Sequence, residues 1–234
     1  KRTNTNSVFV PDAAIDPFNQ SVNLTQFMMG YNGSYQGSNY LLLYFSELYF
    51  SPFSWLPQQS NFDYSQLRPA SRHKWIYLRG SFAYYQKLPF SCFLNILARG
   101  QVSSTPLLPS EQYGLGGFDT VRGYNERVLN DDDAVLLSVE FHTPTWAIVP
   151  FFSEKSTLSD GLELIGFIDS AWGNNIVLMP GEPKADFLAG IGPGLRYYLD
   201  TYLTCRLDYG FKLNKNSVIG TSIGYLHFAF VASY

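Results

Sequence analysis

The chain has 234 residues, of which only 15% are charged and 17% are aromatic, and its net charge of −3 excludes the basic surface of a nucleic-acid-binding protein. No run approaches the roughly 18 uninterrupted apolar residues of a membrane helix. The mean hydropathy of −0.07 with so many aromatic residues is typical of strands that are apolar on one side and polar on the other, as in a transmembrane β-barrel. A secreted β-sandwich shares this alternation but has fewer aromatic residues.

The N-terminal residues 1–12 (KRTNTNSVFVPD) lack the apolar core and cleavage site of a signal peptide. We therefore expect the chain to begin inside a longer precursor or to have been trimmed. We predict a single outer-membrane β-barrel domain over residues 1–234, with residues 1–21 at its periphery.

Alternation of apolar and polar residues with a period of two predicts nine strands in chain order. They cover about 22–35, 38–50, 74–87, 90–103, 134–143, 162–171, 187–198, 201–212 and 217–234. Bacterial single-chain barrels have even strand numbers. Either residues 6–11 supply a tenth strand, or the first one or two segments lie outside an eight-strand wall. The prediction is an all-β, antiparallel transmembrane β-barrel of about 8–10 strands, in which the only helical feature expected is a turn within 104–112.

The polar faces of the predicted strands carry charges of both signs. In the strand over 201–212, the odd positions from Leu203 to Phe211 are apolar, whereas the even positions include two opposite charges, Arg206 and Asp208. Across all strands the polar faces hold Arg79, Arg99, Glu140, Asp169, Arg196, Arg206 and Asp208. Such charges are expected to pair inside a barrel lumen, with the apolar faces toward lipid. Glu140, Arg196, Arg206 and Asp208 are the expected lumen network.

The connections between the strands alternate in length. Short turns are expected near 36–39, 87–90 and 199–202, and long polar loops at about 50–73, 103–133 and 172–186. Outer-membrane barrels show this asymmetry, with short periplasmic turns and long extracellular loops. Two connections depart from this pattern. Residues 143–161 form a long connection at the end where short turns are expected, and residues 213–217 form a short connection at the end where long loops are expected.

The two cysteines and the end of the chain carry weaker signals. Cys92 and Cys205 are too few and too far apart to define a disulfide framework, so we predict two wall-facing thiols. Residues 226–234 alternate and end on the aromatic Tyr234. This pattern fits either the recognition strand of an outer-membrane barrel or an apolar edge strand that closes the chain.

The loop over residues 114–133 (GLGGFDTVRGYNERVLNDDD) holds one arginine, Arg122, near its middle. A long loop costs little more entropy to close than a medium one, but it needs an anchor to hold one conformation. An arginine binds a carboxylate bidentately and with fixed direction. Asp169 shares the polar face of its strand with Glu163, within reach of a loop that folds inward. The alternative is that Arg122 is a solvated loop charge.

Other residues of this loop have expected structural roles. Gly116, Gly117 and Gly123 would allow sharp turns and close packing, and Tyr124 can pack on the wall and still form a hydrogen bond. The acidic run 130–133 lacks the spaced oxygen ligands and distal glutamate of a calcium loop. We therefore predict an exposed acidic loop end and no metal site.

Three motifs resemble one transporter superfamily. GGFDTVRGY (Gly116–Tyr124) resembles the VRGY/VRGF loop of the BamA and two-partner-secretion (TpsB) superfamily, which includes surface-antigen-type C-terminal barrels. LIGFIDSAWG (Leu164–Gly173) is similar to its wall-strand motif, and residues 188–213 with the terminal aromatic strand are similar to its last three strands. The resemblance covers roughly 74–234.

The resemblance implies that the motif loop enters the barrel from outside and that its arginine pairs with the wall aspartate. Carried over to this chain, the pair is Arg122 and Asp169, with Gly116, Gly117, Gly123 and Tyr124 in the same loop-anchoring motif. Members of the superfamily have about sixteen strands preceded by periplasmic POTRA domains, and the chain shows neither. Because an eight-strand barrel is filled by side chains, a polypeptide conduit through this chain alone is in doubt.

The expected function is a translocation or assembly barrel of the bacterial outer membrane, without catalysis and without a cofactor. The alternative is a structural, anchoring or dimerising barrel without a conduit of its own, in a longer protein that carries an enzymatic N-terminal domain. The expected partners are outer-membrane lipid, a second copy or a missing N-terminal part, and a polypeptide client, but no nucleic acid. An outer-membrane enzyme built on His73, His142 or His227 lacks any nucleophile motif, and His142 is expected to be a satisfied lumen histidine.

Overall fold

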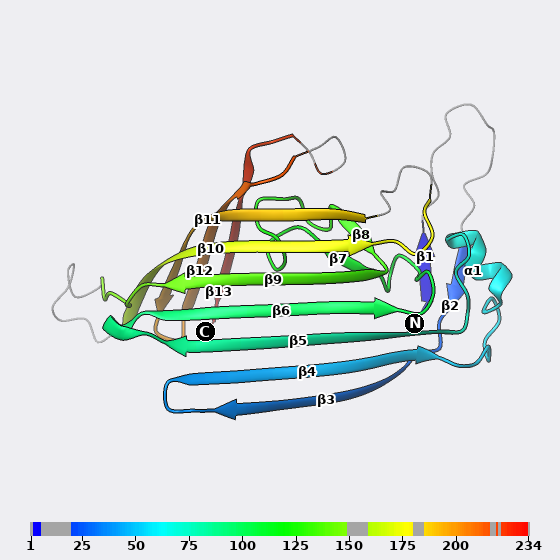
Figure 1. The fold of residues 1–234 in the computed structure, drawn as a ribbon, viewed down its shortest axis with the longest axis horizontal. Coiled ribbons are helices and arrows are strands. Elements are labelled where there is room, and N and C mark those ends of the chain that lie inside the picture. Colours follow the sequence, from blue (N-terminus) through cyan, green and yellow to red (C-terminus); the bar gives the residue numbers. More distant parts are fainter. Residues whose placement is uncertain are drawn as a thin grey trace.

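A computed structural model of the chain describes residues 2–5, 20–148, 159–179, 185–215, 219 and 221–233. Its main sheet has nine antiparallel strands in the order β13-β12-β11-β10-β9-β6-β5-β4-β3 (Figure 1). The strands are β3 (Phe27–Gln36), β4 (Tyr40–Ser51), β5 (Trp75–Lys87), β6 (Phe93–Ser103), β9 (Asp133–His142), β10 (Asp160–Asn174), β11 (Ala185–Leu199), β12 (Leu203–Lys212) and β13 (Gly224–Ala232). The predicted all-β antiparallel fold, with eight to ten strands, is confirmed.

Each of the nine predicted strands corresponds to one strand of this sheet, so the eight-strand alternative is wrong. The first strand starts at Phe27 rather than at residue 22, because β2 (Gln20–Asn23) instead pairs with β1 (Arg2–Thr5) in a separate two-stranded sheet. The tenth strand considered over residues 6–11 lies outside the described residues. Within the described part of the chain, β3 and β13 are the two edge strands and do not pair with each other.

The last strand also starts later than predicted, at Gly224. Ile219, which was expected in this strand, is buried in an apolar cluster with residues of other segments, and its carbonyl accepts a hydrogen bond from Lys212 Nζ at 2.9 Å. The connection between β12 and β13 therefore runs from residue 213 to residue 223. The short turn predicted over 213–217 is wrong, and the connection joins the long-loop end of the sheet.

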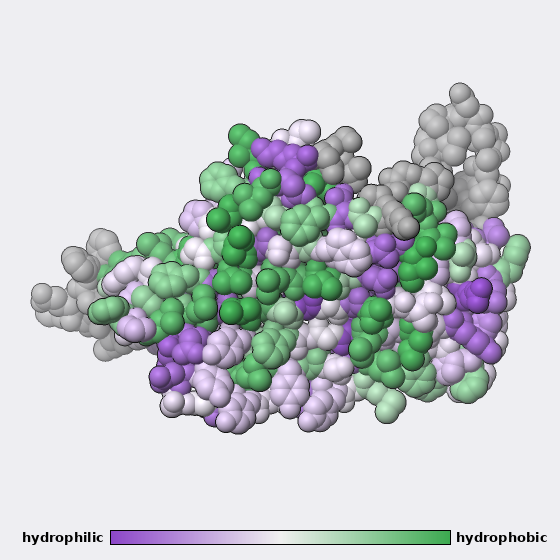
Figure 2. Space-filling view, in the orientation of Figure 1, coloured by the Kyte–Doolittle hydropathy of each residue, from purple (hydrophilic) through white to green (hydrophobic). Residues whose placement is uncertain are grey.

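The two faces of the sheet differ as the alternation predicts. The outward face is apolar, and its exposed side chains include Leu137, Phe141, Leu164, Ile168, Trp172, Ile191, Leu207 and Phe228. In Figure 2, hydrophobic side chains cover much of the strands, and hydrophilic ones gather near the short turns and around the helix. Tyrosines meet near the short-turn end, where Tyr40 packs against both Tyr35 and Tyr84. No helix in the described part of the chain is long and apolar enough to cross a membrane.

One helix was not predicted. α1 (Asn61–Leu67) lies in the loop between β4 and β5 and begins with a capping box, in which Ser60 and Asp63 each accept a hydrogen bond from the other's backbone N–H. Tyr64 and Leu67 turn inward and join Trp75, Tyr77 and other residues in a buried cluster. A helix of seven residues is too short for a periodic apolar pattern, although its capping box was visible in the sequence.

The connection between β6 and β9, residues 104–132, lies on the inner face of the sheet, and we call it the inner loop. It contains the predicted turn, at residues 109–111, and a small hairpin of β7 (Tyr113–Leu115) and β8 (Leu129–Asp131). In Figure 1 it lies behind β9 and β10, while the fainter β12 and β13 show that the sheet curves around behind the front strands. Its buried residues Leu107 and Leu108 join the cluster around α1. Its other buried apolar residues form a second cluster with strand residues and Ile219: Leu115, Val121, Tyr124, Leu129, Ala134, Leu136, Ala171, Leu188 and Ile219.

Two smaller features complete the fold. The turn between β5 and β6 contains a short 3-10 helix, η1 (Pro89–Ser91). Cys92 and Cys205 are both free, as predicted. Cys205 lies in β12, but the placement of Cys92 in a wall strand is wrong, because Cys92 caps η1 and β6 begins at Phe93.

Candidate functional site

The centre of the candidate site is an ion pair between the inner loop and the wall. Arg122 and Asp169 are 2% and 0% exposed. The guanidinium binds the carboxylate bidentately, with Nε donating to Oδ2 at 2.7 Å and Nη2 donating to Oδ1 at 2.8 Å. The backbone N–H of Arg122 also donates to Oδ2, at 3.1 Å, and Ser138 Oγ donates to Oδ1, at 2.6 Å. Asp169 thus accepts four hydrogen bonds, which offset the cost of burying its charge.

The same guanidinium reaches two further carboxylates and a ring. Nη1 donates to Glu140 and lies 3.4 Å from Asp208 Oδ2. The guanidinium carbon is 3.5 Å from the ring centroid of Phe167, within the range of a cation–π contact. Arg122 is therefore enclosed by three anions and one aromatic face.

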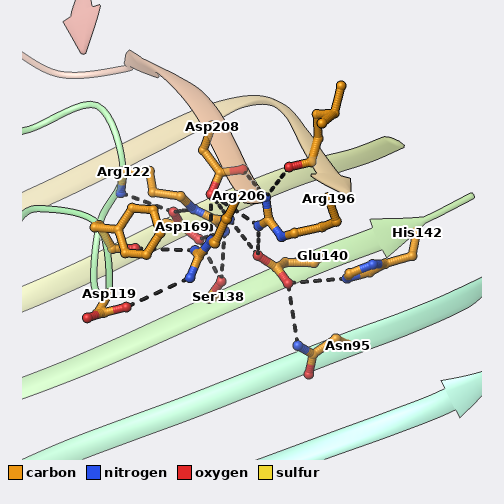
Figure 3. Close-up of polar contacts among 12 residues, drawn as sticks. Asn95, Asp119, Arg122, Ser138, Glu140, His142, Asp169, Arg196, Arg206 and Asp208 are labelled. Carbon is orange, nitrogen blue, oxygen red and sulfur yellow. Dashed lines mark hydrogen bonds and ion pairs between the residues drawn. The ribbon is translucent and has the colours of Figure 1, made fainter. Parts of the chain in front are cut away.

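Two wall arginines balance the excess of acid. Arg196 donates to both oxygens of Asp208, at 2.6 and 3.1 Å, and Arg206 Nε donates to the same carboxylate at 3.0 Å. Figure 3 shows these side chains converging from separate strands on the arginine of the loop. Three arginines thus meet three carboxylates, and the expected lumen residues Glu140, Arg196, Arg206 and Asp208 are all part of this group, which we call the inner network.

Strand register explains why these side chains meet. Asp169 on β10 is directly opposite Ser138 on β9, and Asp208 on β12 is opposite Gly194 on β11. Since side chains two apart on a strand share a face, Glu140 and Arg196 fall on the same inner face. Arg196 and Arg206 are cross-strand partners, which would repel each other, but both donate to Asp208.

Glycines let the loop backbone lie directly on the wall backbone. Gly123 has a φ of +96°, which favours glycine, and a Cβ there would lie 2.7 Å from the carbonyl oxygen of Gly210. A Cβ on Gly190 would lie 2.1 Å from the carbonyl oxygen of Arg122. The backbone N–H of Gly123 also donates to Nε2 of His227 on β13, at 3.0 Å. Side chains at these wall positions would hold the loop away. Gly116 and Gly117, at the start of the motif, also have positive φ, +94° and +107°.

Tyr124 attaches the next position of the loop to two segments. Its side chain is fully buried, and its hydroxyl oxygen lies 2.8 Å from the carbonyl oxygen of Ala189 and 2.9 Å from that of Asn214. The hydroxyl therefore contacts both β11 and the loop that follows β12. Sequence patterns gave no sign of Asn214 as a partner, because it lies in an irregular loop.

A second arginine–aspartate pair closes the long-loop end, and the sequence did not predict it. Arg68 Nη1 donates to Asp132 Oδ1 at 2.7 Å, and Nη2 donates to Oδ2 at 3.2 Å and to Asn175 Oδ1 at 2.8 Å. Arg68 is 1% exposed and Asp132 0%, so the predicted exposed acidic loop end is wrong. This rim pair joins three loops that are far apart in the sequence.

The carboxylate of Asp132 has further partners. It accepts hydrogen bonds from the backbone N–H groups of Leu107 and Ile176, at 2.9 and 3.0 Å. Burial raises the pKa of Asp132 above its ordinary value, although Arg68 and these two N–H groups oppose the shift.

The three histidines lie in separate settings. His142 faces Glu140 and Glu163, with contacts of 3.3 and 3.4 Å, and stacks on Phe93. His73 contacts Asn61 in α1, and His227 accepts the hydrogen bond from the loop. Within the described ranges, no group of three or more His, Cys, Asp or Glu residues is arranged to hold a metal ion.

Comparison with known proteins matched one family model and solved structures that include CdiB from Escherichia coli. A family model described as haemolysin secretion/activation protein ShlB/FhaC/HecB matches residues 2–195. The structure of CdiB from Escherichia coli has a similar fold, with a TM-score of 0.66 and 16% sequence identity. The match covers 90% of this chain and 36% of CdiB, so the chain spans about a third of the length of that protein. A search of curated protein sequences found no match.

Proposed function

Because the chain belongs to the haemolysin secretion/activation family ShlB/FhaC/HecB, whose members are two-partner-secretion (TpsB) transporters, we propose that it is a translocation barrel of the bacterial outer membrane. In this proposal a polypeptide client crosses the membrane on the inner side of the sheet, and the chain performs no covalent chemistry. The observation that carries the proposal is the buried inner network. It holds a loop of 29 residues against the surface along which a client would pass.

The outward face supports a membrane location. Its apolar side chains would face hydrocarbon, and tyrosines near the short turns are suited to the membrane interface, where an aromatic ring has one apolar and one hydrated end. Five charged side chains of the strands instead take part in ion pairs of the inner network: Glu140, Asp169, Arg196, Arg206 and Asp208. This division is the one expected for strands between lipid and a polar lumen.

The inner network is proposed to hold the inner loop in one conformation. Arg122 fixes the orientation of the loop, because its planar guanidinium can bind both oxygens of Asp169 in only one orientation. Gly123 and Tyr124 then fix the backbone against β12 and β11. Because the loop lies on the inner face along which a client would pass, translocation requires either that the loop shifts or that the client passes beside it.

The test uses the full-length protein in its own bacterium. Deletion of the gene should remove at least one polypeptide from the culture medium, and a plasmid copy should restore it. The protein itself should fractionate with the outer membrane. A deletion that leaves the secreted polypeptides unchanged, or a protein found in the soluble fraction, would contradict the proposal.

A second candidate function is a structural or dimerising barrel module without its own conduit. It is favoured by the two edge strands, β3 and β13, which are not paired with each other in the described part of the chain. The molar mass of the purified chain in detergent separates the two candidates. A monomer with a closed wall supports the first, and a dimer joined through β3 or β13 supports the second.

A further inference from the structure

The outward face has a groove at its long-loop end that the proposed function does not use. The groove has a volume of about 500 Å³ and lies on β3, β4 and β5. Its lining includes Met29, Leu48, Phe50 and Ile76, which share the outward face, and Lys74, the residue before β5. Figure 2 shows hydrophobic side chains near the α1 end of these strands, with hydrophilic side chains around α1 beside them. The groove therefore combines an apolar wall with a cation.

One positive charge, Lys74, lines this groove, and a second, Arg72, lies two residues before it in the sequence. Lys74 and Arg72 are both exposed, and no ion pair joins either one to a carboxylate among the residues that the structure describes. His73 lies between them, but burial and the charge of Lys74 lower its pKa below the ordinary value, so it is neutral at pH 7. The local charge is thus about +2, at the edge of an apolar surface.

The segment that carries these charges is held in place. Ser71 Oγ lies 2.8 Å from the carbonyl oxygens of both Tyr64 and Arg68, and the backbone N–H of His73 donates to Asn61 Oδ1 at 3.1 Å. The segment is therefore fixed against α1 and against the residue that forms the rim pair. An ordered backbone lowers the entropic cost of binding a ligand through Arg72 and Lys74.

We propose that the groove binds an anionic, phosphorylated lipid of the surrounding membrane. Its acyl chains lie on the apolar wall, which continues the outward face, and its phosphate contacts Lys74 and Arg72. The inference rests on the proposed membrane location. A free phosphate would use the two charges but not the wall, and a neutral lipid would use the wall but not the charges. Lysine binds phosphate as a point charge, and basic residues at a membrane surface attract anionic lipids.

Strand β5 offers a matched control. Lys87 ends the strand that Lys74 precedes, and it is also exposed, but it lies at the short-turn end beside Gln86 and Asn39. Removing Lys87 changes the net charge of the chain as much as removing Lys74 does. An effect of net charge alone would appear in both variants.

The test is lipid retention by the full chain in nanodiscs of phosphatidylcholine. The nanodiscs contain lipid A with two phosphates, or the same lipid A without phosphates, and bound lipids are counted by native mass spectrometry. The wild-type chain should retain the phosphorylated lipid preferentially. Arg72→Ala/Lys74→Ala should weaken retention by about tenfold or more. Lys74→Ala should also weaken it, and Lys87→Ala, which changes the net charge as much as Lys74→Ala, should leave it unchanged. Millimolar inorganic phosphate should not displace the lipid.

Each contrary outcome has a separate meaning. Equal retention of both lipids by the wild-type chain, an equal loss in Lys87→Ala, or displacement by inorganic phosphate would overturn the lipid site and leave the proposed function standing. A chain that does not enter the nanodiscs at all would overturn both.

Discussion

Arg122 and Asp169 form a fully buried bidentate ion pair across 47 residues of sequence, with both carboxylate oxygens bound to the guanidinium at 2.7 and 2.8 Å. The pair joins a loop to the fourth strand from one edge of the sheet. Asp169 accepts three hydrogen bonds from Arg122, more than any other described residue does, and this leads to the first prediction.

Asp169→Asn should destabilise the docked loop. The amide keeps the shape of the carboxylate but removes its charge, so the three arginines of the inner network face only two carboxylates. Breaking a buried pair in this way costs about 3–5 kcal/mol. Hydrogen–deuterium exchange in detergent should show faster exchange over residues 113–131, while the strands stay protected. Asp119→Asn is the control. This side chain is in the same loop but 78% exposed, and its ion pair with Arg206, at 3.8 Å, is a surface pair that contributes little, so the variant should exchange like the wild type.

Gly210→Ala should displace the loop without a change of charge. A Cβ at this position would lie 2.3 Å from the backbone nitrogen of Gly123, and overpacking of this kind costs about 1–3 kcal/mol. The expected result is faster exchange of the backbone N–H groups near Gly123. Gly166→Ala on β10 makes the same change where no atom lies within 4 Å. Equal behaviour of the two variants would show that the loop does not rest on β12.

Tyr124→Phe should measure how much the hydroxyl of this side chain contributes to stability, independently of its ring. The ring stays packed in the buried cluster, but the hydroxyl no longer contacts Ala189 and Asn214, at a cost of about 1–2 kcal/mol. The midpoint of urea unfolding in detergent should fall. Tyr202→Phe removes a hydroxyl from a ring that is 51% exposed and should leave the midpoint unchanged. If both variants unfold at the wild-type midpoint, the hydroxyl of Tyr124 does not anchor the loop.

Arg68→Met should open the long-loop end. It leaves Asp132 buried without its cationic partner, and the expected loss of unfolding free energy is about 3–5 kcal/mol. Arg72→Met, at an exposed position four residues later, should cost little. A double-mutant cycle with Asp132→Asn measures the coupling directly. A coupling energy near zero would mean that the rim pair does not hold the loops together.

The strands could be predicted from sequence because most of them alternate apolar and polar residues with a period of two. For Asp169 the alternation also gave the correct face, but its partner Arg122 came from the motif, since no pattern links a loop residue to a strand 47 positions away. Neither strand alternation nor a recognised motif pointed to Arg68 and Asp132. They lie in irregular loops 64 residues apart, and an acidic run such as 130–133 looks solvated until its partner is known. Ile219 was assigned to a strand because it is apolar, although it belongs to the cluster beneath the inner loop.

The most direct test of the central claim is secretion by the full-length protein carrying Asp169→Asn, compared with Asp119→Asn. Both variants must first reach the outer membrane at the wild-type level and remain folded, as judged by heat-modifiable mobility on gels. The polypeptide lost from the medium on gene deletion is then quantified. We expect Asp119→Asn to secrete like the wild type and Asp169→Asn to lose most of its secretion. Wild-type secretion by folded Asp169→Asn would contradict a functional role for the docked loop.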